Sequence, residues 1–304
     1  MRATPPTARS AAAIVLAVAC LTVGGCSTAT QNDAEVRTLT AMPQILEVPA
    51  LADQVPASIR ADGLVVATSS NLPPMTFVAP DDHTLVGLDV DVAHAIGSVL
   101  GVRTNLATAG FDTIIPGLQS QRYSMALSSL GVTPERLAVV DFVSYYNGGQ
   151  GFLASAETSM TVAELPDLCG YRVAVQTGSA QQTVLEENQE MCAEAGLPPY
   201  SISTFPANDA AVLAISSRRA DVMYASISIV DYTAEKSDKF RVAGHYKRAM
   251  VGAALAKNSP LTPLVAQAIQ HLIRDGTYAR LLDKWGLREN AVDQAEVVTS
   301  PPTP

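Results

Sequence analysis

The stretches LVVAT (residues 64–68) and DVDVAHAIGSVLG (residues 89–101) decide the fold class of this chain. LVVAT is a short apolar run rich in β-branched residues, as expected of a buried strand. The second stretch has Asp89 as its expected N-cap and Gly101 as its stop. Its apolar residues recur at helical spacing and share one face: Val92, Ile96, Val99 and Leu100. A strand followed by an amphipathic helix predicts an α/β unit.

The same alternation of β-rich runs and helical patterns continues along the chain. Further strands are expected at about residues 125–130, 150–155, 172–177, 221–225 and 250–255. Further helices are expected at about residues 112–121, 134–139, 180–195, 208–218 and 263–284. The last helix has Thr262 as its predicted N-cap, Pro263 at its first position and Gly286 as its stop. Strands that alternate with helices in this way indicate an α/β fold throughout.

Composition narrows the function classes. The chain has 304 residues, of which 48% are hydrophobic and 16% charged, and 29 Asp and Glu outnumber 20 Lys and Arg for a net charge of −9. A chain of this length folds as one large domain or as two of ordinary size. A protein that binds phosphates needs clustered Lys and Arg, and this sequence has no basic run, so nucleic acid is not an expected partner.

The N-terminal residues have the features of an export signal. Two arginines precede an apolar run at residues 11–23, which is too short for a membrane span of about 20 apolar residues. Small residues then lead into Cys26, and this ending resembles the lipobox of bacterial lipoproteins, whose cysteine receives a lipid. We therefore predict a signal peptide at residues 1–25, a lipid on Cys26, and export to the outer face of the cell membrane. The alternatives are an ordinary cleavable signal, or a lipobox at Cys20.

Segments at both ends of the folded part are predicted to lack regular structure. Residues 26–53 are polar and irregular, as expected of a tether between a membrane and a domain. The C-terminal residues 291–304, which end in SPPTP, are predicted to form a loose tail.

Two cysteines remain in the exported chain, Cys169 and Cys192. Export places them in an oxidising compartment, where a disulfide persists, so we predict that they are paired. The competing roles are a metal site, which needs further ligands, and a nucleophile. The histidines are scattered without ligand spacing, at His83, His94, His245 and His271. We therefore predict neither a metal site nor a cofactor.

Common catalytic signatures are missing from the sequence, but residues 128–136 (SSLGVTPER) form a candidate binding segment. We find no Gly-rich phosphate loop, GxSxG turn, HExxH or CxxC pair. In the segment, a strand end leads to a helix that opens at Thr133-Pro134, which places Arg136 in the first helical turn. Arg136 and the backbone N–H groups there suit a carboxylate. The alternative is a solvated Arg136 that pairs with Glu135 or Asp141.

From about Val55 to Leu287 the chain resembles the family 3 extracellular solute-binding proteins, the amino acid receptors of ABC importers. The resemblance rests on the order and spacing of short motifs rather than on any single one. These are LVVAT with Pro73-Pro74, GLDVD at 87–91, FDTIIPGL at 111–118, TPER at 133–136, VDF at 140–142, VAVQTGS at 173–179, DGTY at 275–278 and KWG at 284–286.

The resemblance implies a two-lobed α/β clamshell of the periplasmic-binding-protein type, close to type II. Each lobe would be a mixed sheet flanked by helices, and two crossover segments would form the hinge. Lobe one would comprise residues 54–151 and 250–290, and lobe two residues 152–249. A solute would bind in the cleft between the lobes, and we expect a monomer that delivers it to the membrane permease of an ABC transporter.

The resemblance also assigns ligand contacts to both lobes. The family's carboxylate-binding arginine falls on Arg136, and its companions on lobe one are Ser129, the backbone at Gly131, Phe111 and Leu72. The amide turn of lobe two falls on Gly178, Ser179 and Ala180, at a strand-to-helix junction that suits an anion. Asp89 and Asp91 match the family pattern as well, and we expect them to serve helix capping and lobe architecture.

The chain departs from the family where an aspartate would pair with the α-ammonium of an amino acid, because Ser226 stands there. Ser69 likewise replaces an acidic residue, Leu72 an aromatic lid, and Gly131 a residue with a hydroxyl. Losing a charge-assisted hydrogen bond of about 1.5–3 kcal/mol weakens a free α-amino acid about ten- to a hundredfold, unless another group substitutes. The candidate substitutes are Asp112, Asp81 and Asp82. The alternative is a carboxylate without a free ammonium, such as an amidine-like osmolyte, a keto acid or an acylated amino acid.

We therefore expect a receptor that captures a small carboxylate-bearing solute by lobe closure and delivers it to a permease. Two other classes stay open. One is a sensor or partner-binding lipoprotein that uses the clamshell as a signalling module. The other is a dehydratase-like enzyme, which needs an acidic or basic group with a shifted pKa in the cleft. Ser226 and the scattered histidines argue against an enzyme.

Overall fold

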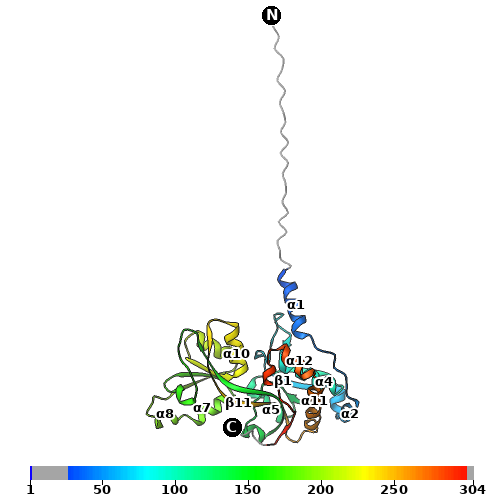
Figure 1. Ribbon diagram of the computed structural model, residues 1–304. Coiled ribbons are helices and arrows are strands. Elements are labelled where there is room, and N and C mark those ends of the chain that lie inside the picture. Colours follow the sequence, from blue (N-terminus) through cyan, green and yellow to red (C-terminus); the bar gives the residue numbers. More distant parts are fainter. Residues whose placement is uncertain (2–26, 300–304) are drawn as a thin grey trace.

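Two long strands run through the main sheet of this protein. In the computed structural model, which describes Met1 and residues 27–299, β7 (Val140–Ser155) pairs antiparallel with β11 (Phe240–Ala256), with bulges on the way. At one end of this pair β6 (Met125–Ala126) joins β11, and at the other end β10 (Val222–Ser226) joins β7. The long pair therefore connects two lobes through one continuous sheet (Figure 1).

Parallel strands extend the sheet outward in both lobes. The remaining strands of the sheet are β1 (Leu64–Thr68), β5 (Thr104–Thr108), β8 (Arg172–Gln176), β9 (Ser201–Phe205) and β12 (Val297–Val298). Within the described residues the sheet has nine strands in the order β5-β1-β6-β11-β7-β10-β8-β9, with β12 on β7. A smaller sheet consists of β2 (Asn71–Leu72), β3 (Thr76–Val78) and β4 (Leu85–Val86). Each lobe thus combines parallel pairs with antiparallel pairs to β7 or β11, which makes its sheet mixed, as predicted.

Figure 1 shows the helices in two groups, one on either side of β11. The first lobe carries α2 (Pro49–Ala52), α3 (Ala57–Asp62), α4 (Leu88–Val99), α5 (Ile114–Gln119), α6 (Pro134–Leu137), α11 (Thr262–Arg274) and α12 (Thr277–Lys284). The second lobe carries α7 (Ala180–Glu187), α8 (Met191–Glu194), α9 (Asn208–Ser216) and α10 (Ile227–Lys236). Short 3-10 turns are η1 (Phe111–Thr113), η2 (Leu165–Leu168) and η3 (Arg288–Asn290). The predicted α/β class with two lobes is confirmed, while the residue boundaries of the lobes stay a prediction.

The second lobe has a hydrophobic cluster of its own. The rings of Phe152 and Tyr224 stack there with their centroids 4.5 Å apart, and both side chains are fully buried. Burying one large apolar side chain contributes about 1.5–3 kcal/mol. Cys192 belongs to the same cluster and forms a disulfide with Cys169, with the two Cα atoms 5.6 Å apart. The predicted cysteine pair is therefore confirmed.

Two helices begin at other residues than the sequence predicted. Helix α4 begins after Gly87 rather than at Asp89, and Asp89 lies in its first turn without capping it. Gly87 is required because a Cβ atom there would lie 2.1 Å from the carbonyl oxygen of Met75. Helix α11 begins after Leu261, so Thr262 is its first residue rather than its N-cap. Both cap predictions, for Asp89 and for Thr262, are wrong by one or two positions.

Both terminal segments are more regular than predicted. Helix α1 (Ser27–Thr40) occupies half of the predicted irregular tether, and Figure 1 shows it standing on the first lobe. The chain after it packs against that lobe, where Leu51 and Val55 are buried. At the C-terminal end β12 pairs with β7, so residues 291–299 of the predicted loose tail include a strand of the main sheet.

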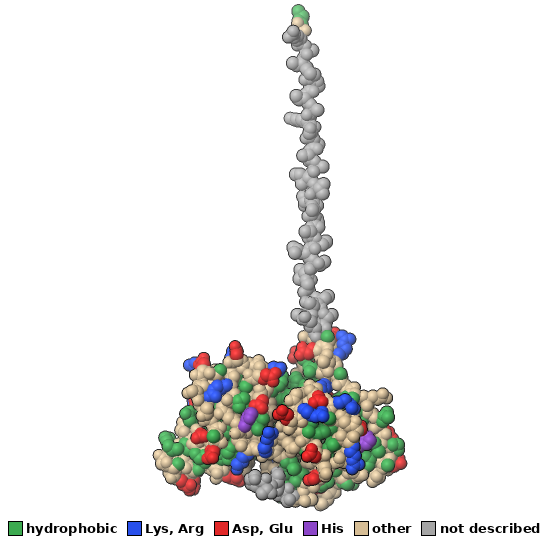
Figure 2. Space-filling model, in the orientation of Figure 1, with side chains coloured by type: hydrophobic (Ala, Val, Ile, Leu, Met, Phe, Trp, Pro, Cys, Tyr) green, Lys and Arg blue, Asp and Glu red, His purple; other side chains and the backbone are tan. Residues whose placement is uncertain are grey.

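The predicted signal peptide, residues 1–25, and Cys26 lie outside the described residues. Within residues 27–299, none of the helices has the length and apolar character needed to cross a membrane. Figure 2 shows Lys and Arg side chains interspersed with Asp and Glu over the face in view. Mixed charges of this kind give this face no extended field of one sign.

Candidate ligand-binding site

A cavity of about 80 Å³ lies between the lobes, beside the long strands. The first lobe lines it with Leu72, Phe111, Ser129, Gly131, Val132, Thr133 and Arg136. The strands β7 and β11 contribute Tyr146, Gly148, Gly149, Gln150, Ala249 and Val251. The second lobe contributes Gln176, Ser179, Ala180, Gln181, Asn208, Tyr224, Ala225, Ser226, Ser228 and Ile229. A ligand held here would contact both lobes at once.

Arg136 enters the cavity from the short helix α6. The sequence predicted the start of this helix correctly, because Thr133 Oγ1 accepts a hydrogen bond from the Arg136 backbone N–H at 3.3 Å. Among the described residues, Arg136 forms no ion pair with Glu135 or Asp141, which was the alternative role. Asp141 instead pairs with Lys257 at 3.1 Å. The arginine is therefore available to the cavity.

The guanidinium of Arg136 makes contacts on both sides of the cleft. Its Nη1 donates to the carbonyl oxygen of Gly131 at 2.8 Å, and its Nη2 donates across the lobes to the carbonyl oxygen of Gly178 at 3.1 Å. Its Cζ lies 5.6 Å from the centre of the Phe111 ring. Burial lowers the pKa of Arg136 to about 10, so the side chain stays cationic at neutral pH. The cavity therefore holds a positioned cation with a planar donor fork.

Ser129 presents a free hydroxyl on the same wall. Its Oγ is buried and has no hydrogen-bond partner among the described residues, and its φ of 50° places the backbone in the left-handed region. Asp89 holds this turn from behind: its Oδ2 accepts from the Ser129 N–H at 2.9 Å, and its Oδ1 accepts from the hydroxyl of Tyr145. Burial raises the pKa of Asp89 to about 7. A strained serine with an unused donor suits a ligand that brings its own acceptor.

The second lobe faces Arg136 with the starts of helices. Ser179 caps α7, because its Oγ accepts from the Gln182 N–H at 3.1 Å. Gly178 precedes it with φ of 74°, and a Cβ atom there would lie 2.9 Å from the Cβ of Asp112. Glycine is needed at this position because the two lobes meet there. Ser226 ends β10 just before α10, with its Oγ 3.3 Å from the Oγ of Ser228.

Sequence reasoning missed the amide side chains of the cavity. Asn208 Nδ2 donates to Gln176 Oε1 at 3.0 Å, and the hydroxyl of Tyr224 donates to Gln150 Oε1. Gln176 ends β8 and Asn208 begins α9. Because ligands bind at the carboxyl ends of parallel strands, this strand end was the signal that could have found Gln176.

The predicted contact residues mostly reach the cavity. Those that line it are Arg136, Ser129, Gly131, Phe111, Leu72, Ser179, Ala180 and Ser226. Gly178 lies beside it and offers only its carbonyl, to Arg136. Ser69 lies behind the wall, where its N–H donates to Ser128 Oγ at 3.0 Å and its hydroxyl lies 2.9 Å from the same atom. The side chain of Ser69 is thus engaged by the protein rather than turned to the cavity.

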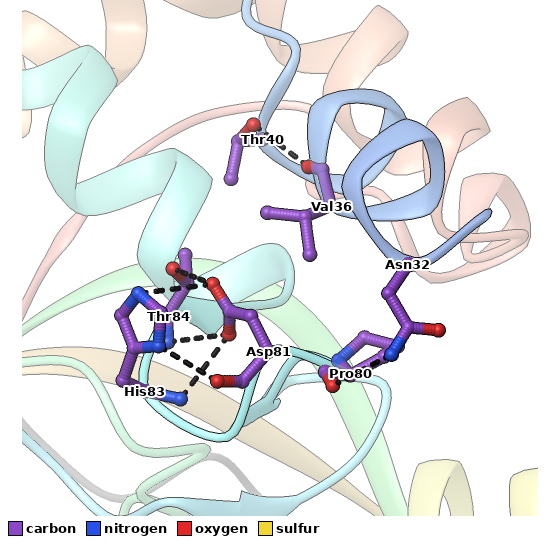
Figure 3. A network of polar contacts seen from close by, with 7 residues as sticks. All are labelled: Asn32, Val36, Thr40, Pro80, Asp81, His83 and Thr84. Atoms are coloured by element: carbon purple, nitrogen blue, oxygen red, sulfur yellow. Dashed lines mark hydrogen bonds and ion pairs between the residues drawn. The ribbon is translucent and has the colours of Figure 1, made fainter. Parts of the chain in front are cut away.

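None of the proposed substitutes for the missing aspartate lines the cavity, although Asp112 lies beside it, against Gly178. Asp81 is held in its own turn by the N–H of Thr84 at 2.9 Å and by the Thr84 hydroxyl, as Figure 3 shows. The Thr84 hydroxyl is the main cause that lowers the pKa of Asp81 to about 2. Asp82 lines a different hollow on the surface, and Asp112 is exposed with its Oδ1 against Gly110. Among the described residues that line the cavity, no Asp or Glu occurs.

Comparison with known families agrees with this architecture. A sequence model of the bacterial extracellular solute-binding proteins, family 3, matches residues 64–288. The match spans most of the chain and includes both lobes and the cavity between them. The chain therefore belongs to this family of two-lobed binding proteins.

Individual relatives extend over most of the chain as well. The arginine-binding protein ArgT of Corynebacterium glutamicum is 29% identical over 258 residues, which is 84% of either chain. An ancestral arginine-binding protein bound to arginine superposes with a TM-score of 0.67 at 28% identity, covering 73% of this chain and 97% of that one. The ancestral amino acid-binding protein AncCDT-1, a precursor of cyclohexadienyl dehydratase, superposes with a TM-score of 0.66 at 30% identity, covering 75% and 97%.

Proposed function

We propose that this protein captures a small carboxylate-bearing solute, an amino acid or an amino-acid derivative, and delivers it to the membrane permease of an ABC importer. The observation that carries the proposal is Arg136, a cation that reaches into the cavity between the lobes. A guanidinium matches a carboxylate with two parallel hydrogen bonds. The relatives named as arginine-binding proteins support a ligand that carries an amino-acid carboxylate.

Capture would proceed by closure of the lobes. In an open form, Arg136 and the free hydroxyl of Ser129 would dock the carboxylate on the first lobe. The backbone N–H of Ala180, at the start of α7, would then reach the same carboxylate from the second lobe, while the N–H of Ser179 donates to the carbonyl oxygen of Gln176 at 3.2 Å. The ligand favours closure to the extent that it binds the closed form more tightly than the open one.

We infer that the protein binds its ligand without transforming it. Relatives are named as binding proteins, although AncCDT-1 is a precursor of a dehydratase. General acid–base chemistry needs a group in contact with the ligand that exchanges a proton near neutral pH. The titratable side chains on the described cavity wall are Arg136, Tyr146 and Tyr224, and burial raises the pKa of both tyrosines. Asp89, with its pKa near neutrality, is enclosed behind Ser129.

We propose further that the chain is exported and then receives a lipid on Cys26. An acyl chain on Cys26 would keep the receptor at the outer face of the membrane, close to its permease. Cells that express the full chain should incorporate a labelled fatty acid into it, and Cys26→Ser should lose the label. Equal labelling of both proteins would reject Cys26 as the lipidated residue.

The binding proposal is tested by thermal unfolding of the chain from residue 27 onward. The panel contains amino acids, their deaminated and N-acylated analogues, and cyclic osmolytes. A ligand at about a hundred times its Kd stabilises the folded protein by about 2.7 kcal/mol, which moves the melting temperature by several degrees. We expect stabilisation by at least one carboxylate. No shift with any carboxylate in the panel would reject the import function and favour a sensor or partner-binding role.

A further inference from the structure

The cavity receives positive potential from both lobes. On the second lobe, α7, α9 and α10 all begin at its wall, where Ala180, Asn208 and Ser226 line it. These helices have 8, 9 and 10 residues. Each helix start carries about half a positive charge, because its backbone N–H groups have no partner within the helix. Arg136 adds a full positive charge from the first lobe.

The described wall of the cavity has no carboxylate to balance this charge. Asp112 and Glu135 lie on adjoining elements, outside the wall, and Glu135 is beside Arg136 on α6. Asp89 is fully buried behind Ser129. Asp231, one turn into α10, lies 2.7 Å from Nε2 of His245. An ammonium group bound at the start of α10 would therefore meet hydroxyls, amides and a helix N-terminus, but no anion.

We propose, on the basis of the import function above, that the ligand is a small carboxylate whose α-substituent is uncharged, such as a hydroxyl, keto or N-acyl group. Its carboxylate would bind Arg136 and Ser129. Its α-substituent would place an oxygen at the start of α10, where the Ser226 hydroxyl and the free backbone N–H groups donate. A free α-ammonium there loses about ten- to a hundredfold in affinity, since it has no charged partner. Ser226 is thus the specificity-determining residue of the site.

The test uses pairs of ligands that differ only at the α-substituent. Suitable pairs are L-alanine with L-lactate, L-leucine with L-2-hydroxyisocaproate, and L-aspartate with L-malate, and L-glutamine is compared with N-acetyl-L-glutamine. Each is titrated calorimetrically into the chain from residue 27 onward. We expect the hydroxy or acyl member of any pair that binds to do so at least about tenfold more tightly than the amino acid.

Variants at residue 226 make the test sharper. Ser226→Asp should reverse the preference within a pair, since it supplies an anion for the ammonium. The substitution is compatible with the fold, because aspartate is a favoured N-cap and Ser226 already occupies the N-cap of α10. Ser226→Ala is the matched control: it removes the hydroxyl without adding charge and should keep the preference for the uncharged substituent.

The outcomes separate this inference from the import function on which it rests. Tighter binding of the amino acid members by the wild type overturns the inference and leaves the import function standing. Asp112→Asn would then show whether Asp112 moves in to pair with the ammonium. An unchanged preference in a folded Ser226→Asp variant also overturns the role of Ser226. Binding of no carboxylate by the folded wild type rejects both proposals together.

Discussion

Arg136 takes its hydrogen-bond partners from both lobes, so its contacts depend on closure. The carbonyl of Gly131 holds one nitrogen of the guanidinium at 2.8 Å, and the carbonyl of Gly178 holds another at 3.1 Å. The ring of Phe111 covers one side of the group. These contacts fix the orientation of the donor fork, which lowers the entropic cost of binding a carboxylate.

We expect Arg136→Ala to abolish detectable binding of the ligand. Arg136→Lys should weaken it about ten- to a hundredfold, because lysine keeps the charge but lacks the planar fork. The melting temperature of the ligand-free protein should change little in either variant, since water can replace arginine at the two carbonyls. Calorimetric titration and thermal unfolding measure the two effects separately. Normal binding by Arg136→Ala would remove this residue from the site.

Asp89 makes stability depend on pH in a defined direction. Burial raises its pKa from 3.8 to about 7, so the folded protein binds this proton more tightly than the unfolded chain does. The stabilising contribution of protonated Asp89 is therefore complete below the unfolded pKa and is lost as the pH rises through about 7. In Asp89→Asn the free energy of unfolding should fall less between about pH 5 and pH 8 than in the wild type. Urea unfolding of both proteins across that range checks the slopes, and equal slopes would contradict the assignment.

Elements with uniform apolar character were predictable from the sequence. Strands β1, β8 and β10 lie within one residue of their predicted bounds. Helix α10 was missed, because its first residues ISIV continue the apolar run of β10 without a turn residue between them. The first part of β7, residues 140–149, was missed, and NGGQG at residues 147–151 argues against a strand. Those glycines serve packing: a Cβ atom at Gly149 would lie 2.3 Å from Cδ1 of Ile227.

The site was predictable to the extent that it follows from local chemistry. The four consecutive residues TPER predict a helix cap at Thr133 and Arg136 in the first turn. The structure has this cap. Gln176 and Asn208 come from different elements and meet only in the folded chain. Ser69 could not be placed, because its partner Ser128 is distant in sequence and the two meet by packing. Periodicity locates elements, but it does not tell which side chains satisfy one another.

The disulfide belongs to the second lobe, and its loss should act there. Cys169 and Cys192 are 23 residues apart, and closing a loop of this length stabilises by about 3 kcal/mol in the chain-entropy model. Reduction should lower the melting temperature and speed amide exchange in β8, α7 and α8 more than in β1 and α4. The double variant Cys169→Ala/Cys192→Ala is the control and should not respond to reductant. An unchanged melting temperature after full reduction would contradict this prediction.

At the scale of the whole molecule, the lobes also meet outside the cavity. Phe77 on β3 and Tyr232 on α10 have ring centroids 6.3 Å apart, and Phe77 also packs edge-on against Trp285 at 5.8 Å. Phe77 and Trp285 belong to the first lobe and Tyr232 to the second. The arrangement of the lobes in this structure therefore includes an aromatic contact that involves no ligand.

We expect Tyr232→Ala to weaken ligand binding about two- to tenfold without touching the cavity. An aromatic pair of this kind contributes about 0.5–1.5 kcal/mol, and here it favours only the closed form. The change should appear as faster dissociation with little effect on association, as stopped-flow fluorescence can measure. Tyr232→Phe keeps the ring and should behave like the wild type. An equal loss in both variants would point to the hydroxyl rather than to the contact between rings.

The hydrogen bond from Arg136 to the Gly178 carbonyl should limit which solutes bind in the proposed site. The guanidinium has five N–H donors, and the Gly178 carbonyl accepts from one of them, so a solute that used this donor in the proposed site would compete with that carbonyl. A neutral carbonyl or hydroxyl oxygen accepts a hydrogen bond no more strongly than the Gly178 carbonyl does. Such a solute therefore gains no free energy by displacing that carbonyl. A formally negative oxygen gains roughly the difference between a charge-assisted and an ordinary hydrogen bond. We therefore expect the bond between Arg136 and Gly178 to favour anionic solutes over neutral ones in the proposed site.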